Sequence, residues 1–151
     1  MPDQKFAQDL ADPRWCVFRH VSRTSRMITG LFDQAFAPLG LTAHQFNLMM
    51  TLHRVGPNSV GTIANVVGVN PSTVPRLVKP LVEKGWVMTR PGADKRQRMS
   101  SLTPLGEAKL ALALPVWMQL QQSFLAQFGD ENWRQSMTDL RELRRTGRHL
   151  G

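Results

Sequence analysis

Hydroxyl and cationic side chains share one face of a short predicted helix in the middle of the chain. They lie opposite an apolar stripe and are Ser72, Thr73, Arg76 and Lys79. Hydroxyl, guanidinium and ammonium groups are the groups with which proteins bind the phosphates and base edges of nucleic acids. This face therefore predicts a helix that binds nucleic acid.

A basic hairpin follows this helix. Two short β-type runs, residues 86–90 and 99–103, are joined by the sequence PGADKRQR. The charged residues of the hairpin are Arg90, Asp94, Lys95, Arg96 and Arg98. Residues 70–103 hold seven Lys or Arg against two acidic residues, an excess of five in a chain of net charge +8. A basic helix alone is usually a solvated surface, but helix and hairpin together form one cationic surface. The pattern indicates a winged helix, with a recognition helix for the major groove and a wing for the adjacent backbone or minor groove.

In contrast, the sequence does not favour a catalytic or a metal-binding site. The sequence has no G-x-S-x-G, phosphate-loop or H-E-x-x-H motif, and paired carboxylates are scarce. The histidines lack the spacing of a metal site, and they are His20, His44, His53 and His149. We therefore expect a protein that is not an enzyme, with no catalytic residue, no bound metal and no cofactor.

The composition is that of a folded, basic protein. The 151 residues fit one domain, with 42% hydrophobic and 20% charged residues, and the excess of positive charge favours a polyanionic partner. The apolar runs are shorter than the roughly 20 residues of a membrane span. The N-terminus lacks the apolar core of a secretory signal. Together these features predict a cytoplasmic protein that binds no membrane.

Caps and apolar spacing predict the elements that position the basic surface. The recognition helix begins at Asn70-Pro71 and ends at Gly85, with an N-cap, a proline at the first position and a terminal glycine. Its apolar stripe is Val74, Leu77, Val78, Leu81 and Val82. Of its two other prolines, Pro75 lies near the first turn, and Pro80 should bend the helix.

Two short helices precede the recognition helix. Thr42 and Gln45 form a capping box at the start of one of them. Ser59 caps the next, which ends at Gly68. The three-residue turn 68–70 then completes a helix-turn-helix.

Long helices flank this region. One begins at Asp12-Pro13, with an apolar stripe that includes Phe18 and Val21, and another begins at Thr103-Pro104, with Pro115 expected to kink it. A last helix has the inward-facing residues Trp133, Met137, Leu140 and Leu143. These helices exceed what a helix-turn-helix needs, so we predict that they pair with a second copy, placing two recognition helices about 34 Å apart on a palindrome. The predicted fold is mainly α with a small β-hairpin wing: a winged helix-turn-helix lobe over 41–103, flanked by dimerisation helices over 12–40 and 104–148.

The chain resembles the MarR family of winged-helix transcriptional regulators over about residues 13–145. The matching segments are Leu41-Thr42-x-x-Gln45-Phe46, Pro71-Ser72-Thr73-Val74, Leu81 to Val87, Asp94-Lys95-Arg96 and Leu102-Thr103-Pro104-Leu105-Gly106. The wing signature D-x-R followed by L-T-x-x-G is the specific part. The resemblance implies dimers built from the terminal helices, palindromic operators, and release by small aromatic or oxidising signals.

By position, Arg96 resembles the family's wing arginine, which enters the minor groove, with Asp94 holding its side chain. Arginine suits a narrow, negative groove. The residues expected in the major groove are Ser72, Thr73 and Arg76. Those expected on phosphates are Lys79, Arg90, Lys95 and Arg98.

In this family the effector lies between the first helix, the second helix and the DNA-binding lobe. The candidate lining residues here are Arg19, Arg23, Met27, His44 and Met49. A cation beside apolar walls suits an aromatic carboxylate. The alternative is that the arginines are solvated and the methionines fill the core.

Cys16 offers a second signalling chemistry. It resembles in position the sensing cysteine of the family's peroxide-responsive branch, but this chain has no tyrosine to flank it. Because Cys16 lies close to Trp15 and Phe18 in the sequence, we interpret it as a small buried hydrophobic residue.

We therefore expect a homodimeric regulator, a repressor, that binds double-stranded DNA at a palindromic operator and is released by a small aromatic anion. One alternative is a winged-helix module that binds RNA or protein. The other is a regulator that senses oxidants through Cys16.

Overall fold

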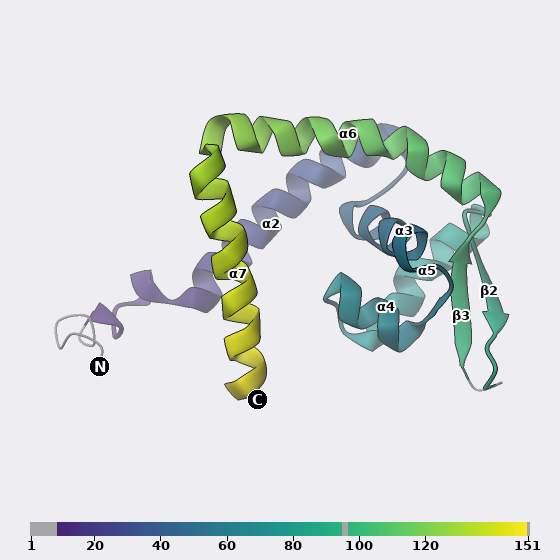
Figure 1. Cartoon of the computed structure of the whole chain (residues 1–151), viewed down its shortest axis with the longest axis horizontal. Helices are drawn as coiled ribbons and strands as arrows, with labels where there is room; N and C mark the ends of the chain where they lie inside the picture. The colour runs from purple at the N-terminus through teal and green to yellow at the C-terminus, as the bar shows by residue number, and fades with distance from the viewer. Residues whose placement is uncertain (1–8, 95–96, 151) are drawn as a thin grey trace. The chain divides into compact units, whose positions relative to one another are not determined.

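A computed structural model of the protein describes residues 9–94 and 97–150. Figure 1 shows the elements in chain order: η1 (Pro13–Trp15), α2 (Val17–Phe36), η2 (Ala37–Leu39), α3 (Ala43–Val55), β1 (Asn58–Ser59), α4 (Val60–Val67), η3 (Pro71–Thr73), α5 (Val74–Glu83), β2 (Val87–Pro91), β3 (Arg98–Leu102), α6 (Pro104–Phe128) and α7 (Asp130–Leu150). The fold is mainly helical with a small three-stranded antiparallel sheet, which confirms the predicted class. The chain divides into two compact units, Met1–Ala111 and Leu112–Gly151.

The core of the first unit lies among α3, α4, α5 and the sheet, which Figure 1 shows grouped together. Its largest fully buried side chains are Phe36, Leu48, Met49, Ile63, Val74, Leu81, Val87 and Leu110. Phe36 was absent from the predicted stripe of the first helix. Its ring stacks on Phe46 of α3 with 4.6 Å between centroids, which attaches the end of α2 to the lobe.

Two residues of the stripe predicted for the first helix, Phe18 and Val21, are open to solvent in the single chain. Phe18 is 77% exposed and Val21 is 44% exposed. The helical period groups these residues on one stripe, and no described residue of the first unit buries the part of that stripe at the start of α2.

Side-chain caps begin α3 and α4 where the sequence predicts. The Thr42 Oγ1 atom accepts from the Gln45 N–H at 3.2 Å, and the Gln45 Oε1 atom accepts from the Thr42 N–H at 3.1 Å, which confirms the capping box. The Ser59 Oγ atom caps α4 by accepting from the Thr62 N–H. An unpredicted link comes from Asp33 of α2, whose Oδ1 accepts from the Ala43 N–H at 2.7 Å.

The start of the recognition helix differs from the prediction. Asn70 and Pro71 begin a 3₁₀ turn, and α5 itself begins at Val74. Pro75 consequently lies in the first turn, where its missing N–H has no intrahelical acceptor to lose, whereas Pro80 is interior. The helix ends as predicted at Gly85, whose φ is 72°. The Trp86 N–H donates to the Leu81 carbonyl at 2.9 Å, which closes a Schellman motif.

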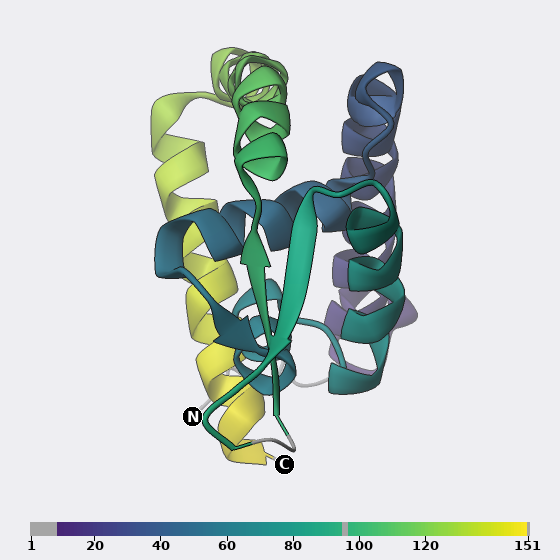
Figure 2. The ribbon, with the colours of Figure 1, turned by 90° about the vertical axis from the view of Figure 1, so that its right-hand side faces the viewer.

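The hairpin is present, with each strand displaced by one residue from the predicted runs. β2 and β3 pair from Val87 opposite Leu102 to Pro91 opposite Arg98, and Figure 2 shows them side by side. The two-residue strand β1 joins the other edge of β3, with Asn58 opposite Ser100. Sequence analysis missed β1 because two residues show no alternation.

The second unit holds the rest of α6 and all of α7. The ring of Phe124 lies 6.4 Å from that of Trp133, centroid to centroid. The structure describes every residue of α7, and none of them is buried. The exposed fractions of Met137, Leu140 and Leu143 are 38%, 39% and 47%, so the face predicted to point inward is uncovered in one copy of the chain. Among the described residues, no helix combines the length and apolarity that a membrane crossing requires.

Candidate nucleic-acid interface

The helix α5 separates its polar and apolar residues onto opposite sides. Val74 and Leu81 are fully buried and Val78 nearly so, whereas Arg76 and Lys79 are exposed. The Lys79 Nζ atom lies 4.0 Å from the Glu83 Oε1 atom, and its side chain is 79% exposed. A surface pair of this kind contributes little, so the Lys79 ammonium is available to a phosphate.

The turn before α5 orients one of the candidate residues. Ser72 is exposed, and the Asn70 Oδ1 atom accepts from both its N–H at 3.0 Å and its Oγ–H at 2.8 Å. A hydroxyl has one hydrogen to donate and two lone pairs. With its hydrogen used by Asn70, Ser72 presents an acceptor, which suits an exocyclic amine of adenine or cytosine. Thr73 beside it is half-buried. Asn70 was predicted as a cap, and its role in orienting Ser72 was missed.

The wing carries arginines on both of its faces. Val87 and Ser100 are buried, and their positions in the register place Arg98 on that same face of the ribbon. Arg90 alternates with them and lies on the other face. Both arginines are exposed, so they can bind phosphates on different sides of the wing.

The tip of the wing is only partly described. The Gly92 N–H donates to the Gln97 carbonyl at 2.8 Å, and the Gln97 N–H donates to the Asp94 carbonyl at 2.9 Å. Asp94 is exposed. Lys95 and Arg96 lie outside the described residues, so the minor-groove role of Arg96 and its support by Asp94 stay predictions from the sequence.

The threonine and the glycine of the motif L-T-x-x-G each have a structural role at the base of the wing. The Thr103 Oγ1 atom donates to the Gly85 carbonyl at 2.6 Å and accepts from the Gly106 N–H at 3.0 Å. A Cβ atom on Gly106 would lie 2.0 Å from the Trp86 carbonyl oxygen. Only glycine permits this approach of α6 to the start of β2, and the wing is thereby joined directly to the first turn of α6.

Trp86 is also flanked by two lysines. The Nζ atoms of Lys84 and Lys109 lie 4.7 and 4.9 Å from the centroid of its ring, within the range of cation–π attraction. Nearby, the His53 Nδ1 atom lies 2.8 Å from the Glu107 Oε2 atom, which links α3 to α6. The contacts of Lys109 with Trp86 and of His53 with Glu107 join residues distant in sequence, and sequence analysis did not find them.

The candidate effector residues separate into two groups. Arg19, Arg23 and Met27 follow at intervals of four residues on α2 and are exposed, so they share one face of that helix. His44 is exposed in the first turn of α3. Met49 is fully buried in the lobe, which agrees with the alternative that this methionine fills the core. In this conformation Met49 is closed to a ligand.

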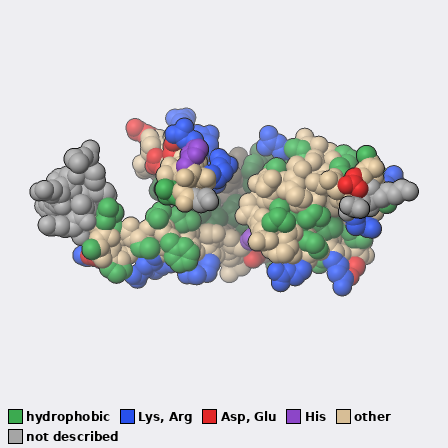
Figure 3. Space-filling model, turned by 90° about the horizontal axis from the view of Figure 1, so that it is seen from below, with side chains coloured by type: hydrophobic (Ala, Val, Ile, Leu, Met, Phe, Trp, Pro, Cys, Tyr) green, Lys and Arg blue, Asp and Glu red, His purple; other side chains and the backbone are tan. Residues whose placement is uncertain are grey.

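The prediction that Cys16 is buried is wrong in the single chain. Cys16 is exposed, and the neighbouring Trp15, Val17 and Phe18 are 54%, 55% and 77% exposed. Figure 3 shows apolar side chains, in green, at the surface of the described part of the chain, interspersed with Lys and Arg side chains. Cys16 lies at the junction of η1 and α2.

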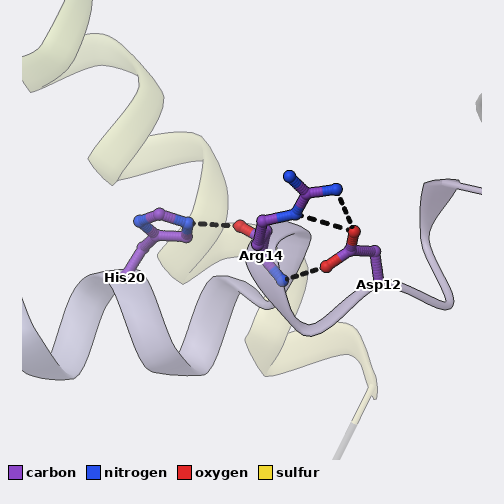
Figure 4. Close-up of polar contacts among 3 residues, drawn as sticks. All are labelled: Asp12, Arg14 and His20. Atoms are coloured by element: carbon purple, nitrogen blue, oxygen red, sulfur yellow. Dashed lines mark hydrogen bonds and ion pairs between the residues drawn. The ribbon is translucent and has the colours of Figure 1, made fainter.

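Asp12 is a cap, as predicted, but of the 3₁₀ turn η1 and not of the long helix, because α2 begins only at Val17; Figure 4 shows the contacts. The Asp12 Oδ1 atom accepts from the Arg14 N–H, and Oδ2 accepts from the Arg14 Nε–H, both at 2.8 Å. These two hydrogen bonds, first that from the Arg14 side chain, hold the pKa of the Asp12 carboxyl below its ordinary value. The His20 Nε2 atom lies 2.6 Å from the Arg14 carbonyl oxygen, so His20 donates there and fastens the turn to α2.

Residues 9–94 and 97–150 contain no group of three or more His, Cys, Asp or Glu placed to hold a metal ion. The chemistry that these residues offer is hydrogen bonding and charge neutralisation by α5 and the wing.

Known proteins share this arrangement. The MarR family model matches residues 41–97. YwoH, an HTH-type transcriptional regulator of Bacillus subtilis, is 29% identical over 77% of this chain and 85% of its own length. The crystal structure of the M. tuberculosis transcriptional regulator MosR in complex with DNA has a TM-score of 0.81 and 27% identity, covering 89% of this chain and 98% of that chain. Bordetella bronchiseptica BpsR, whose DNA binding is regulated by 6-hydroxynicotinic acid, shares the fold at 23% identity and a TM-score of 0.76, covering 84% of this chain and 97% of its own.

Proposed function

We propose that the chain is a DNA-binding transcriptional regulator of the MarR family, which the matching family model and relatives support, and that it acts as a homodimeric repressor that binds a palindromic operator and is released by a small aromatic anion. A protein of this kind catalyses no reaction and acts on double-stranded DNA. The observation that carries the proposal is the exposed cationic face of α5, whose opposite face is buried in the lobe. A recognition helix requires this combination, because its buried face holds the reading face in position.

Exposed apolar residues support the homodimer. They lie at the start of α2 and along α7 and include Phe18, Val21, Met137, Leu140 and Leu143. Apolar patches of this kind mark interaction surfaces, and a second copy of the chain would bury them. A two-fold dimer presents two copies of α5, which favours a palindromic operator.

The exposed face of α2 and the effector of one structural neighbour support an aromatic anion as the effector. Arg19 and Arg23 supply cations beside the apolar side chain of Met27 on one exposed face, which suits a planar carboxylate. The effector named for BpsR, 6-hydroxynicotinic acid, is an aromatic acid. Such a ligand relieves repression only if it binds more tightly to a conformation that cannot hold the operator.

The test is fluorescence anisotropy with a labelled duplex from immediately upstream of the gene and with a scrambled duplex, at several salt concentrations. Tight binding to the upstream duplex alone, with a steep salt dependence, is the expected result. Addition of aromatic acids should then release the DNA, and sedimentation should give the mass of a dimer.

Other outcomes separate the alternatives. Equal affinity for both duplexes at matched salt, together with no site recovered from random DNA, would favour the module that binds RNA or protein. Release by peroxide that the Cys16→Ser variant loses would favour the oxidant sensor, for which the exposure of Cys16 provides access.

A further inference from the structure

Lys84 connects the end of the recognition helix to a corner of the lobe that is distant in sequence. It is the C-cap residue of α5, and its N–H donates to the Pro80 carbonyl at 3.1 Å. Its Nζ atom donates to the Gly40 carbonyl at 2.6 Å. Gly40, with φ of 66°, follows η2 and separates α2 from α3. One ammonium group therefore ties α5 to the α2–α3 corner across 44 positions of sequence.

The same ammonium group lies at the base of the wing. It is 4.7 Å from the centroid of the Trp86 ring. The Trp86 carbonyl in turn accepts from the Thr103 N–H at 3.1 Å, next to the close approach of Gly106. Lys84 thus contacts both the α2–α3 corner, to which it ties α5, and Trp86, which directly precedes β2. An ordinary surface lysine does not make two such contacts.

We propose that Lys84 is a positioning residue for operator recognition, which acts by holding α5 at its angle and not by contacting DNA. This inference rests on the proposed function. The residues that face the bases lie at the other end of the helix, because Lys84 follows Val74 by ten residues, roughly 15 Å along the axis. Lys84 is exposed, but its Nζ atom is bonded to the Gly40 carbonyl of the same lobe.

A small change in the angle of α5 displaces the residues at its far end by a large distance. A tilt of about 10° about the Lys84 end would move the residues near Val74 by roughly 2.5 Å, given a rise of about 1.5 Å per residue. Hydrogen bonds to base edges tolerate only a few tenths of an ångström. Loss of the tie should therefore harm the reading of bases more than the binding of phosphates, which flexible cations can follow.

The experiment compares Lys84→Met with Lys79→Met on the full-length protein. Both variants remove one ammonium group and keep an unbranched stem, and Lys79 lies exposed on α5 with only a 4.0 Å pair to Glu83. Anisotropy with operator and scrambled duplexes is measured over a range of salt. We expect Lys84→Met to weaken operator binding about fivefold, or about 1 kcal/mol, with scrambled-duplex binding and the salt slope unchanged. Lys79→Met should weaken both duplexes and lower the slope by about 0.9.

Three results would overturn the proposal. A slope lowered by Lys84→Met as much as by Lys79→Met would make Lys84 a phosphate contact. An equal loss on both duplexes would indicate general destabilisation. Unchanged affinity for the operator would show that the tie has no role. Lys84→Arg, which keeps a cationic donor, should recover most of the operator affinity.

A measurement without DNA separates this inference from the proposed function. Amide hydrogen exchange at Leu41 and Trp86 in the free protein should accelerate in Lys84→Met and stay unchanged in Lys79→Met, because the Lys84 ammonium group bonds to Gly40, next to Leu41, and lies over the Trp86 ring. If the wild-type protein fails to prefer any operator, the proposed function fails, while the exchange result still decides whether the tie exists. Equal exchange in wild type and Lys84→Met would exclude it.

Discussion

The winged-helix lobe and the terminal helices differ in how far one copy of the chain completes them. In the lobe, α3, α4 and α5 cover one another, and Leu48, Ile63 and Leu81 are inaccessible to solvent. In α7 no residue is buried, and at the start of α2 Phe18 is mostly exposed. The lobe therefore buries its apolar residues within its own chain, whereas the terminal helices expose apolar surface. Under the proposed function, the first region recognises DNA and the second pairs with another copy.

Two phenylalanines of the same helix test this difference most strongly. Phe36→Ala removes a ring that is 0% exposed and stacked on Phe46, and should lower the free energy of unfolding by about 3–5 kcal/mol. Phe18→Ala removes a ring that is 77% exposed, and should change the stability of the monomer by less than about 0.5 kcal/mol. Urea unfolding at low protein concentration measures both.

Self-association should show the reverse order. Phe18→Ala should raise the dissociation constant of the dimer in sedimentation experiments, since its ring is available to a partner. If Phe18→Ala left self-association intact and Phe36→Ala were harmless, the separation of the two regions would be wrong.

Two glycines provide the next comparison. An added methyl group at Gly106 would meet the Trp86 carbonyl at 2.0 Å, so Gly106→Ala should destabilise the lobe by about 3 kcal/mol. Gly147 of α7 has nothing within 4 Å of an added Cβ, and Gly147→Ala should stabilise the helix by about 0.5–1 kcal/mol. Thermal unfolding followed by circular dichroism distinguishes the two. A Gly106→Ala protein as stable as wild type would refute the close approach of α6 to the wing.

A smaller effect is expected at the tip of the wing. Arg96→Ala should weaken operator binding about tenfold, because loss of a groove-bound guanidinium costs about 1–2 kcal/mol. The fold of the lobe should be unaffected, which circular dichroism would verify. Unchanged operator affinity in a folded variant would remove Arg96 from the interface, and Arg148→Ala, at the exposed end of α7, is the matched control.

The smallest expected effect concerns the start of α2. Hydrogen bonds from Arg14 depress the pKa of Asp12 in the folded protein below its ordinary value of 3.8. The cap is therefore fully stabilising above that ordinary value and is lost as the pH falls through the depressed folded pKa. Amide exchange or chemical shift at Arg14 should change only in that acidic range. In Asp12→Asn the acidic transition at Arg14 should disappear, and its persistence would assign the transition to another group.

Much of the fold was predictable because its signals are local. Thr42 with Gln45, Ser59, Gly68 and Gly85 act on neighbouring backbone groups, so caps and stops could be identified from sequence spacing. The alternation of polar and apolar residues likewise placed Arg76 and Lys79 on the exposed side of α5. Contacts between distant residues were not predictable: β1 exists only because β3 offers it an edge, and the bond from Lys84 to Gly40 joins residues with no common pattern.

The sequence by itself determined which residues share a face, where helices begin and end, and where positive charge accumulates, because these depend on the period of the backbone and on nearest neighbours. Only the tertiary structure decided which faces are covered. Val74 and Phe18 both lie on regular apolar stripes, yet one is buried and the other open. Burial depends on what the rest of the chain brings to a face: within the described residues, Phe36 at the end of α2 is covered by the lobe, whereas Phe18 at its start and Leu143 of α7 stay exposed.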